Sequence, residues 1–300
     1  MKPRIPLPPS FADRPFASKD ARAAGFGPKR LRGSDLQRPF HGVRIPGASE
    51  PDLVLLCLAC TRRLPDHAFF CGPTSARLLG VPLPSRLEPS RTLHVAVPTP
   101  CPPPSGRGIS GHTVTAADAD TVLFQSLRIS SPERTWFDLG AILNLRELVA
   151  ASDFLIHWRN PLTSRPKLAA AFARYSGRRG RRMLRRALDL MNDRAESPPE
   201  SHTRVILEEA HIEGIAVNFP ITTSGGFRYR ADLALPEYRV LLEYQGDYHR
   251  DAQQFRADMT RRGRLEADGW YVFLVNAADL RDPEELIARL RRVLATRPRR

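Results

Sequence analysis

The sequence predicts an α/β (α+β) fold, with a small mixed β-sheet flanked by helices and a separate, mostly helical N-terminal domain. Two observations support this prediction. Three hundred residues exceed the size at which a single hydrophobic core usually stops growing, so two domains are expected. From Glu200 onward, hydrophobic periodicity gives the order α-β-β-β-α-β-α, which suits a small sheet with helices against it.

The sequence predicts mainly helices in the N-terminal half. Residues 1–17 are rich in proline and are expected to form a mobile tail. The domain that follows, residues 18–160, begins with a short helix, a basic turn and a small strand, a pattern compatible with the remnant of a winged helix. Its predicted helices are Ser18–Ala24, Glu50–Leu64, His67–Leu79, one that Ser131 caps, and Leu145–Trp158; its predicted strand is Thr92–Val97.

A basic helical linker is predicted over residues 165–196, after a boundary near residues 159–165. Seven arginines fall in the thirteen residues Arg174–Arg186. They could follow a phosphate backbone, and they could equally form the solvated face of a helix that buries Met183, Leu184, Ala187 and Leu188. The two interpretations are compatible. The candidate nucleic-acid contacts, here and later in the chain, are Arg178, Arg179, Arg181, Arg182, Arg185, Arg261 and Arg262.

The C-terminal domain, residues 197–300, opens with a helix-start signal. Ser197 is placed as the cap, Pro198 at the first helical position and Glu200 three residues after the cap, which together form a capping box. This role explains Glu200 structurally, although its carboxylate could also face a metal site.

Two neighbouring strands carry a pair of acidic residues. The segments Phe227–Leu235 and Arg239–Gln245 have strand patterns, and a two-residue turn between them places Asp232 opposite Leu241. Glu243 then lies diagonally across from Asp232 on the same face, close enough to share one cation. A three-residue loop would reverse this parity and separate the two side chains.

Converging carboxylates in a cationic chain indicate a metal site that acts on phosphodiesters. Their oxygens suit Mg²⁺ (or Mn²⁺), which can activate a bound water and offset charge on a leaving oxygen. The alternative is that both carboxylates are exposed strand residues, each paired with one of the nearby arginines Arg228, Arg230 and Arg239.

The chain is strongly basic, with 46 Lys and Arg against 32 Asp and Glu, a net charge of +14. This charge favours a polyanionic partner such as DNA, unless it only reflects a basic proteome. The longest apolar stretch is too short to cross a bilayer, and the first nine residues lack the apolar run of a secretory signal, so a cytoplasmic protein without membrane contact is expected. Cys57 and Cys60 are interpreted as small buried hydrophobes rather than half of a zinc site.

Residues 197–296 resemble the PD-(D/E)xK nuclease superfamily, in particular its branch related to the very-short-patch-repair endonucleases. The resemblance rests on an ordered series of elements: Glu200, Asp232 after Arg230 and Ala231, residues 243–249, Asp258 with Arg261 and Arg262, and residues 269–273. It implies a restriction-endonuclease-like fold in which Asp232 and Glu243 hold the metal, Glu200 assists, and His249 lies near the reacting phosphate.

One position departs from the superfamily pattern. Gln245 stands where the superfamily usually has Lys and this branch often has Asp. Glutamine can orient a water or donate to a phosphate oxygen, but it supplies no charge to the transition state. His249 is either a proton shuttle or a surface histidine that follows a strand.

Residues 18 to about 158 loosely resemble proteins with an abortive-infection antitoxin-like (AbiEi-like) module. The residues that carry this resemblance are Ala23–Phe26, Phe40–Pro46, Gly72–Pro84 and Ser130–Leu139. It implies binding of DNA, of a toxin-like protein, or of a second copy of the chain.

Two functions follow as hypotheses. The first is a Mg²⁺-dependent DNA endonuclease, from which the sequence does not distinguish an RNA nuclease. The alternative is a catalytically inactive DNA-binding or antitoxin-like transcriptional regulator on a decayed nuclease fold.

Overall fold

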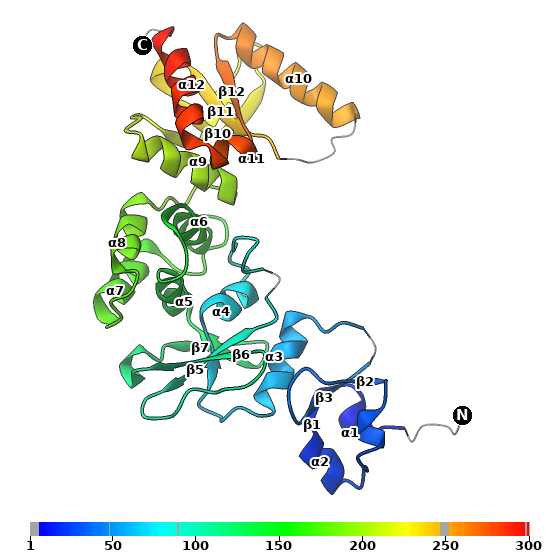
Figure 1. Ribbon diagram of the computed structural model, residues 1–300. Coiled ribbons are helices and arrows are strands. Elements are labelled where there is room, and N and C mark those ends of the chain that lie inside the picture. Colours follow the sequence, from blue (N-terminus) through cyan, green and yellow to red (C-terminus); the bar gives the residue numbers. More distant parts are fainter. Residues whose placement is uncertain (1–5, 48, 89, 247–251, 298, 300) are drawn as a thin grey trace. The chain divides into compact units, whose positions relative to one another are not determined.

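The computed structural model describes residues 6–47, 49–88, 90–246, 252–297 and 299 (Figure 1). It confirms the mixed α/β class, with helices and three sheets in the described residues. The chain divides into two compact units. The N-terminal unit is residues 1–141 with 170–178, and the C-terminal unit is residues 142–169 with 179–300.

The N-terminal unit begins with a three-stranded antiparallel sheet in the order β1-β3-β2. Its first strand lies within the segment predicted to be a mobile tail, and that prediction is wrong for residues 6–17, because Phe16 and Ala17 are buried in the sheet. The elements here are α1 Pro9–Ala12, β1 Phe16–Ala17, α2 Ser18–Ala23, a 3₁₀ turn Arg30–Arg32, β2 Leu36–Gln37 and β3 Val43–Pro46.

A five-stranded sheet, ordered β6-β5-β4-β8-β7, fills the rest of the N-terminal unit. Its elements are α3 Leu53–Thr61, β4 Phe69–Phe70, α4 Gly72–Leu78, β5 Leu93–Pro98, β6 Ile109–Val114, a 3₁₀ turn Ala116–Asp118, β7 Thr121–Phe124, β8 Leu127–Ser130 and α5 Pro132–Leu139. The predicted helix His67–Leu79 is wrong in its first part, because Phe69 and Phe70 form the central strand β4. This unit therefore contains more strand than the mostly helical domain that was predicted.

One hydrophobic cluster joins the two sheets of the N-terminal unit through α3. Phe40, Val43 and Ile45 from the small sheet pack in the same cluster as Cys57 and Cys60. Both cysteines are fully buried, and burial raises the pKa of the Cys60 thiol to about 12. The interpretation of these cysteines as buried hydrophobes is confirmed.

The C-terminal unit is built on a four-stranded mixed sheet in the order β12-β11-β10-β9. Strands β9, β10 and β11 form an antiparallel meander, and β12 returns parallel to β11 after α10, as a parallel pair requires a crossover connection. The elements are α6 Leu145–Leu155, α7 Arg165–Arg174, α8 Arg181–Leu190, α9 Pro198–Glu209, β9 Ala216–Thr222, β10 Arg228–Leu235, a 3₁₀ turn Pro236–Tyr238, β11 Val240–Tyr244, α10 Ala252–Ala267, β12 Tyr271–Val275, α11 Ala277–Arg281 and α12 Pro283–Ala295.

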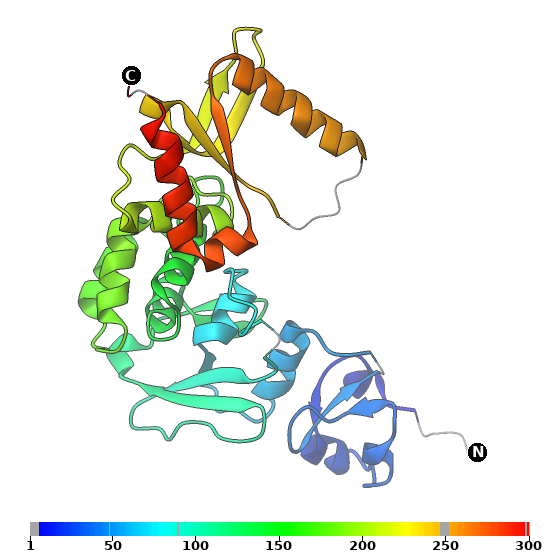
Figure 2. The same ribbon diagram turned by 45° about the horizontal axis from the view of Figure 1, so that its top comes forward.

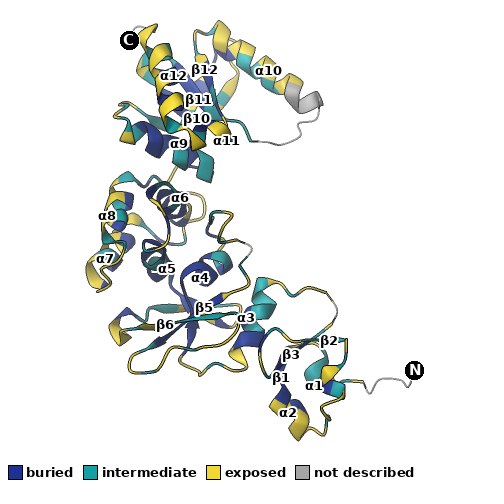
Figure 3. Cartoon of the chain, viewed as in Figure 1, coloured by how far each residue is buried: buried dark blue, intermediate teal, exposed yellow. Residues whose placement is uncertain are grey.

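Helices cover both faces of this sheet (Figures 1 and 2). Helices α9 and α12 pack on one face around Leu233, Leu242 and Phe273, while α10 packs on the other through Leu265. The strands are largely buried, whereas α10 and α12 keep exposed outer surfaces (Figure 3). The order predicted from Glu200 onward is confirmed, with α11 as an added short helix. None of the helices in the described segments is long and apolar enough to span a bilayer.

The connection between β10 and β11 differs from the predicted two-residue turn. A 3₁₀ turn over Pro236–Tyr238 and a left-handed Arg239, with φ of 52°, make a four-residue connection. Leu235 consequently pairs with Val240, and this register puts Asp232 across from Glu243 instead of Leu241. The predicted partner was wrong. Both loop lengths are even, but side-chain alternation along β10 breaks between Ala231 and Ala234, so the loop length no longer fixes the face of Asp232 relative to Glu243.

A buried ion pair ties α6 to α9. Arg204 Nη2 lies 2.7 Å from Asp153 Oδ2, and the two side chains are 3% and 2% exposed. Ser201 Oγ donates to Asp153 Oδ2 at 2.7 Å, and the amide of Asn192 donates to Oδ1 at 2.7 Å. These contacts explain why α6 belongs to the C-terminal unit, although it precedes the boundary predicted near residues 159–165.

We expect Asp153→Ala to destabilise the C-terminal unit by about 3–5 kcal/mol, because it leaves the buried Arg204 charge with only the partly exposed Glu208, 3.0 Å away, as a counter-ion. Urea unfolding measures the change. The matched control is Glu266→Ala, which breaks the surface pair between Arg262 and Glu266 and should cost less than about 1 kcal/mol. Similar losses in the two variants would contradict the assigned role of Asp153.

Candidate functional site

The strands β10 and β11 diverge at the two acidic residues. Their described pairing ends at Leu233 and Leu242. One step further along, the amide of Tyr244 donates to Asp232 Oδ2 at 3.0 Å, so a carboxylate replaces the main-chain acceptor of a regular ladder. The alternation of side chains between the two faces of β10 also breaks here. Ala231 and Ala234 are three positions apart, yet both pack in the hydrophobic cluster that contains Leu265 of α10. The strand end is therefore shaped around the Asp232 side chain.

Asp232 lies beside Glu200. The two carboxylates and Thr203 line a narrow gap between α9 and the sheet that is too small to admit a water-sized sphere. Burial raises the pKa of Asp232, while the Tyr244 amide and the positive charge of Arg261 act to lower it. Burial also raises the pKa of Glu200, and the negative charge of Asp232 adds to that rise. The site is thus short of positive charge.

Glu200 forms half of the predicted capping box. Its amide donates to Ser197 Oγ, as the box requires, and its Oε1 accepts from the same hydroxyl at 2.8 Å. Its Oε2 accepts from the amide of Glu196 at 2.9 Å, and not from the amide of the cap residue Ser197. The cap role of Ser197 is confirmed, and the reciprocal half of the box is not. The same geometry also orients the carboxylate toward Asp232, so the two interpretations of Glu200 are compatible.

Glu243 is held by an arginine from α10. Arg261 Nη2 donates to Glu243 Oε1 at 2.6 Å and to the carbonyl of Arg230 at 2.8 Å. The Nε atom of Arg261 is buried without a hydrogen-bond partner among the described residues, which leaves a desolvated donor unsatisfied. Arg230 itself pairs with Glu196 at 2.7 Å. A cation that pairs with Glu243 is therefore Arg261, which the sequence predicted as a nucleic-acid contact.

Two further predicted residues follow β11. The amide of Gln245 donates to the carbonyl of Val275 at 2.7 Å, which continues the pairing of β11 with β12 and leaves a half-buried side chain near the strand end. His249 falls in residues 247–251, outside the described residues.

The basic segment after α7 is the outer surface of a helix. Leu184 and Ala187 are buried under α8, whereas Arg182 and Arg185 are exposed. This confirms the helix-face interpretation, and contact with a phosphate backbone stays a prediction. Arg178 and Arg179 precede the helix and are exposed, and Arg181 is half-buried. Arg262, on α10, pairs with Glu266 at 2.7 Å.

The residues fit a metal ion only after one rearrangement. Within the described residues, Asp232 Oδ1 has no hydrogen-bond partner, whereas Glu243 Oε1 is occupied by Arg261. No group of three or more His, Cys, Asp or Glu side chains is assembled for a metal in the part of the chain that the structure describes. Glu243 is available to a metal only once Arg261 leaves it.

Comparison with known proteins gives a distant relationship and no family. No family model matches the chain. Two uncharacterized proteins of Mycobacterium tuberculosis, from strains CDC 1551 and H37Rv, are each 27% identical over 267 residues, which cover 88% of this chain and 94% of theirs. The similarity extends over both units.

The raised pKa of Asp232 predicts a gain in stability when its charge is removed. Because the folded pKa exceeds the unfolded value, the ionised group opposes folding at neutral pH, and this cost disappears as pH falls through the folded pKa. We therefore expect Asp232→Asn to raise the unfolding midpoint at neutral pH, with the gain fading in acid.

The control for this experiment is Asp268→Asn. Hydrogen bonds from Ser224 lower the pKa of Asp268, so its ionised form favours folding and its neutralisation should not stabilise the protein at neutral pH. Thermal unfolding at several pH values measures both variants. A loss of stability in Asp232→Asn at neutral pH would contradict the described charge balance.

Proposed function

We propose that the C-terminal unit is a metal-dependent nuclease that hydrolyses phosphodiester bonds in DNA, with Asp232 and Glu243 as the ligands of a divalent ion. The observation that carries the proposal is the group of buried carboxylates where β10 and β11 diverge. Burial raises the pKa of both Asp232 and Glu200. A divalent cation would relieve this excess of negative charge more fully than one arginine does.

The protein's own residues have separable tasks in this proposal. Arg261 neutralises Glu243 in the resting protein and moves from it to the negative charge of the DNA. Glu200 places a second negative charge beside Asp232, which favours a bound cation. Gln245 donates a hydrogen bond to a phosphate oxygen. The ion would supply an acidified water as the nucleophile and would offset charge on the phosphate.

The element order supports the resemblance to the PD-(D/E)xK superfamily. The series α9-β9-β10-β11-α10-β12 gives a mixed four-stranded sheet covered on both faces, and the two acidic residues lie on adjacent strands. Fold alone does not establish activity, so the proposal depends on the carboxylate site.

The proposal predicts nicking of supercoiled plasmid DNA by the purified protein with Mg²⁺ or Mn²⁺. Removing a ligand with Asp232→Asn or Glu243→Gln should lower the rate by at least roughly a hundredfold. Arg292→Gln, which changes an exposed arginine of α12 that pairs with Glu285, is the control and should lose far less. Equal cleavage by wild type and both ligand variants would reject the proposal.

A second function is favoured by one specific contact. The 2.6 Å pairing of Arg261 with Glu243 closes the site, and Gln245 brings no charge to it. A protein in which this pairing persists on DNA would be a non-catalytic DNA-binding or antitoxin-like regulator. It would bind DNA in a salt-sensitive manner, and binding would survive Asp232→Asn without any cleavage.

A further inference from the structure

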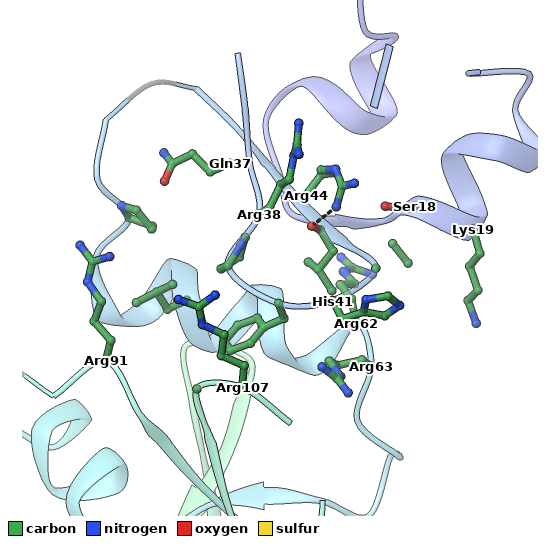
Figure 4. Close-up of a pocket in the computed structure, with 18 of the residues that line it drawn as sticks. Ser18, Lys19, Gln37, Arg38, His41, Arg44, Arg62, Arg63, Arg91 and Arg107 are labelled. Carbon is green, nitrogen blue, oxygen red and sulfur yellow. Dashed lines mark hydrogen bonds between the residues drawn. The ribbon is translucent and has the colours of Figure 1, made fainter. Parts of the chain in front are cut away.

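A broad groove crosses the N-terminal unit, far in sequence from the carboxylate site. It lies between the small three-stranded sheet and α3, and has a volume of about 1280 Å³. Figure 4 shows Arg38 and His41 from the β2–β3 connection on one side, Arg62 and Arg63 at the end of α3, and Arg107 before β6. The groove thus collects side chains from segments that sequence periodicity does not connect.

The lining of the groove is strongly cationic. Its described lining includes seven arginines and one lysine against one carboxylate, Glu50, which pairs with Arg91. Burial lowers the pKa of Arg44, and the positive charges of Arg38 and Arg22 lower it further, so these guanidinium groups repel one another. A cleft lined with one sign of charge concentrates its field and attracts an oppositely charged ligand.

The walls of the groove are held in place by the protein core. Phe40, Val43 and Ile45 belong to the same buried cluster as residues of α3 and of the five-stranded sheet. Arg44 donates from Nε to the carbonyl of Leu31 at 2.7 Å, and Arg63 donates to the carbonyl of Ser105 at 3.3 Å. The repulsion between these cations is therefore built into the folded unit, and an anionic ligand would relieve it.

The size and chemistry of the groove favour a nucleic-acid backbone. Its volume exceeds the roughly 300–1,000 Å³ of pockets that enclose a small ligand. Guanidinium groups fork onto phosphate oxygens, and a row of them matches repeated phosphates better than a single anion. Arg62, Arg63 and Arg107 are exposed, so they can reach a ligand without rearrangement of the core.

We infer that this groove is a phosphate-backbone binding site for DNA, with Arg38, Arg62, Arg63 and Arg107 as its contacts. The site is separate from the carboxylate centre and does not depend on the proposed cleavage. In this inference the N-terminal unit binds the DNA backbone.

The test uses the full-length protein with EDTA present, so that metal binding and cleavage cannot contribute. Fluorescence anisotropy of a labelled DNA duplex is measured between about 50 and 200 mM salt. The double variant Arg62→Ala with Arg107→Ala should weaken binding by roughly tenfold or more at low salt and reduce the slope of log affinity against log salt by about two.

Two matched controls make the result specific. Arg128→Ala removes an exposed arginine of the same unit outside the groove and should leave the affinity nearly unchanged. Arg292→Ala removes an exposed arginine of the C-terminal unit and should also leave the affinity nearly unchanged.

The inference is overturned if the groove double variant and Arg128→Ala have equal affinity and equal salt slopes. It is also overturned if wild type ignores DNA but binds vesicles of an anionic phospholipid. A failure of plasmid nicking, with groove-dependent binding intact, would reject the proposed nuclease and leave this site standing.

Discussion

The C-terminal unit depends on a buried charge pair between α6 and α9. Asp153 and Arg204 lie 2.7 Å apart and almost wholly out of water, where each charge alone would be costly. Hydrogen bonds from Ser201 and Asn192 satisfy the remaining acceptor positions of Asp153. The pair fixes α9 against α6, and α9 carries Glu200 beside Asp232. The ion pair between Asp153 and Arg204 therefore helps to position Glu200 in the candidate site.

The two ion pairs differ in their exposure to water. Burial raises the pKa of Asp153 and of Asp232 alike, so that shift does not distinguish the two places. The Asp153 and Arg204 side chains are 2% and 3% exposed, whereas those of Glu243 and Arg261 are 20% and 30% exposed. A partly exposed arginine can exchange its carboxylate for water, so the second pair costs less to open than the first. This difference separates a structural ion pair from a site that can accept another cation.

Local signals made much of this fold predictable. The cap at Ser197 and the strand patterns on either side of the β10–β11 connection depend on residues within one or two turns of chain. The register was mispredicted because a left-handed Arg239 after a 3₁₀ turn gives no clear sequence signal. Strand β4 was missed because two residues, Phe69 and Phe70, are too short for periodicity to reveal.

The parts that sequence did not reveal are those made by tertiary packing. Asp232 and Glu243 were predicted as a pair, but the hydrogen bond from Arg261 on α10 to Glu243 on β11 has no local sequence pattern. The arginine groove combines segments between Lys19 and Arg107 that meet only because the two sheets share a core. Basic composition indicated a polyanionic partner, and the fold shows where the charge gathers.

The central claim is that Arg261 and a divalent ion compete for Glu243. Isothermal titration of Mn²⁺ into wild type, Arg261→Gln and Asp232→Asn tests it most directly. The account predicts that Arg261→Gln binds Mn²⁺ more tightly than wild type and that Asp232→Asn binds it hardly at all. Indistinguishable titrations for the three proteins, or weaker binding in Arg261→Gln, would contradict it.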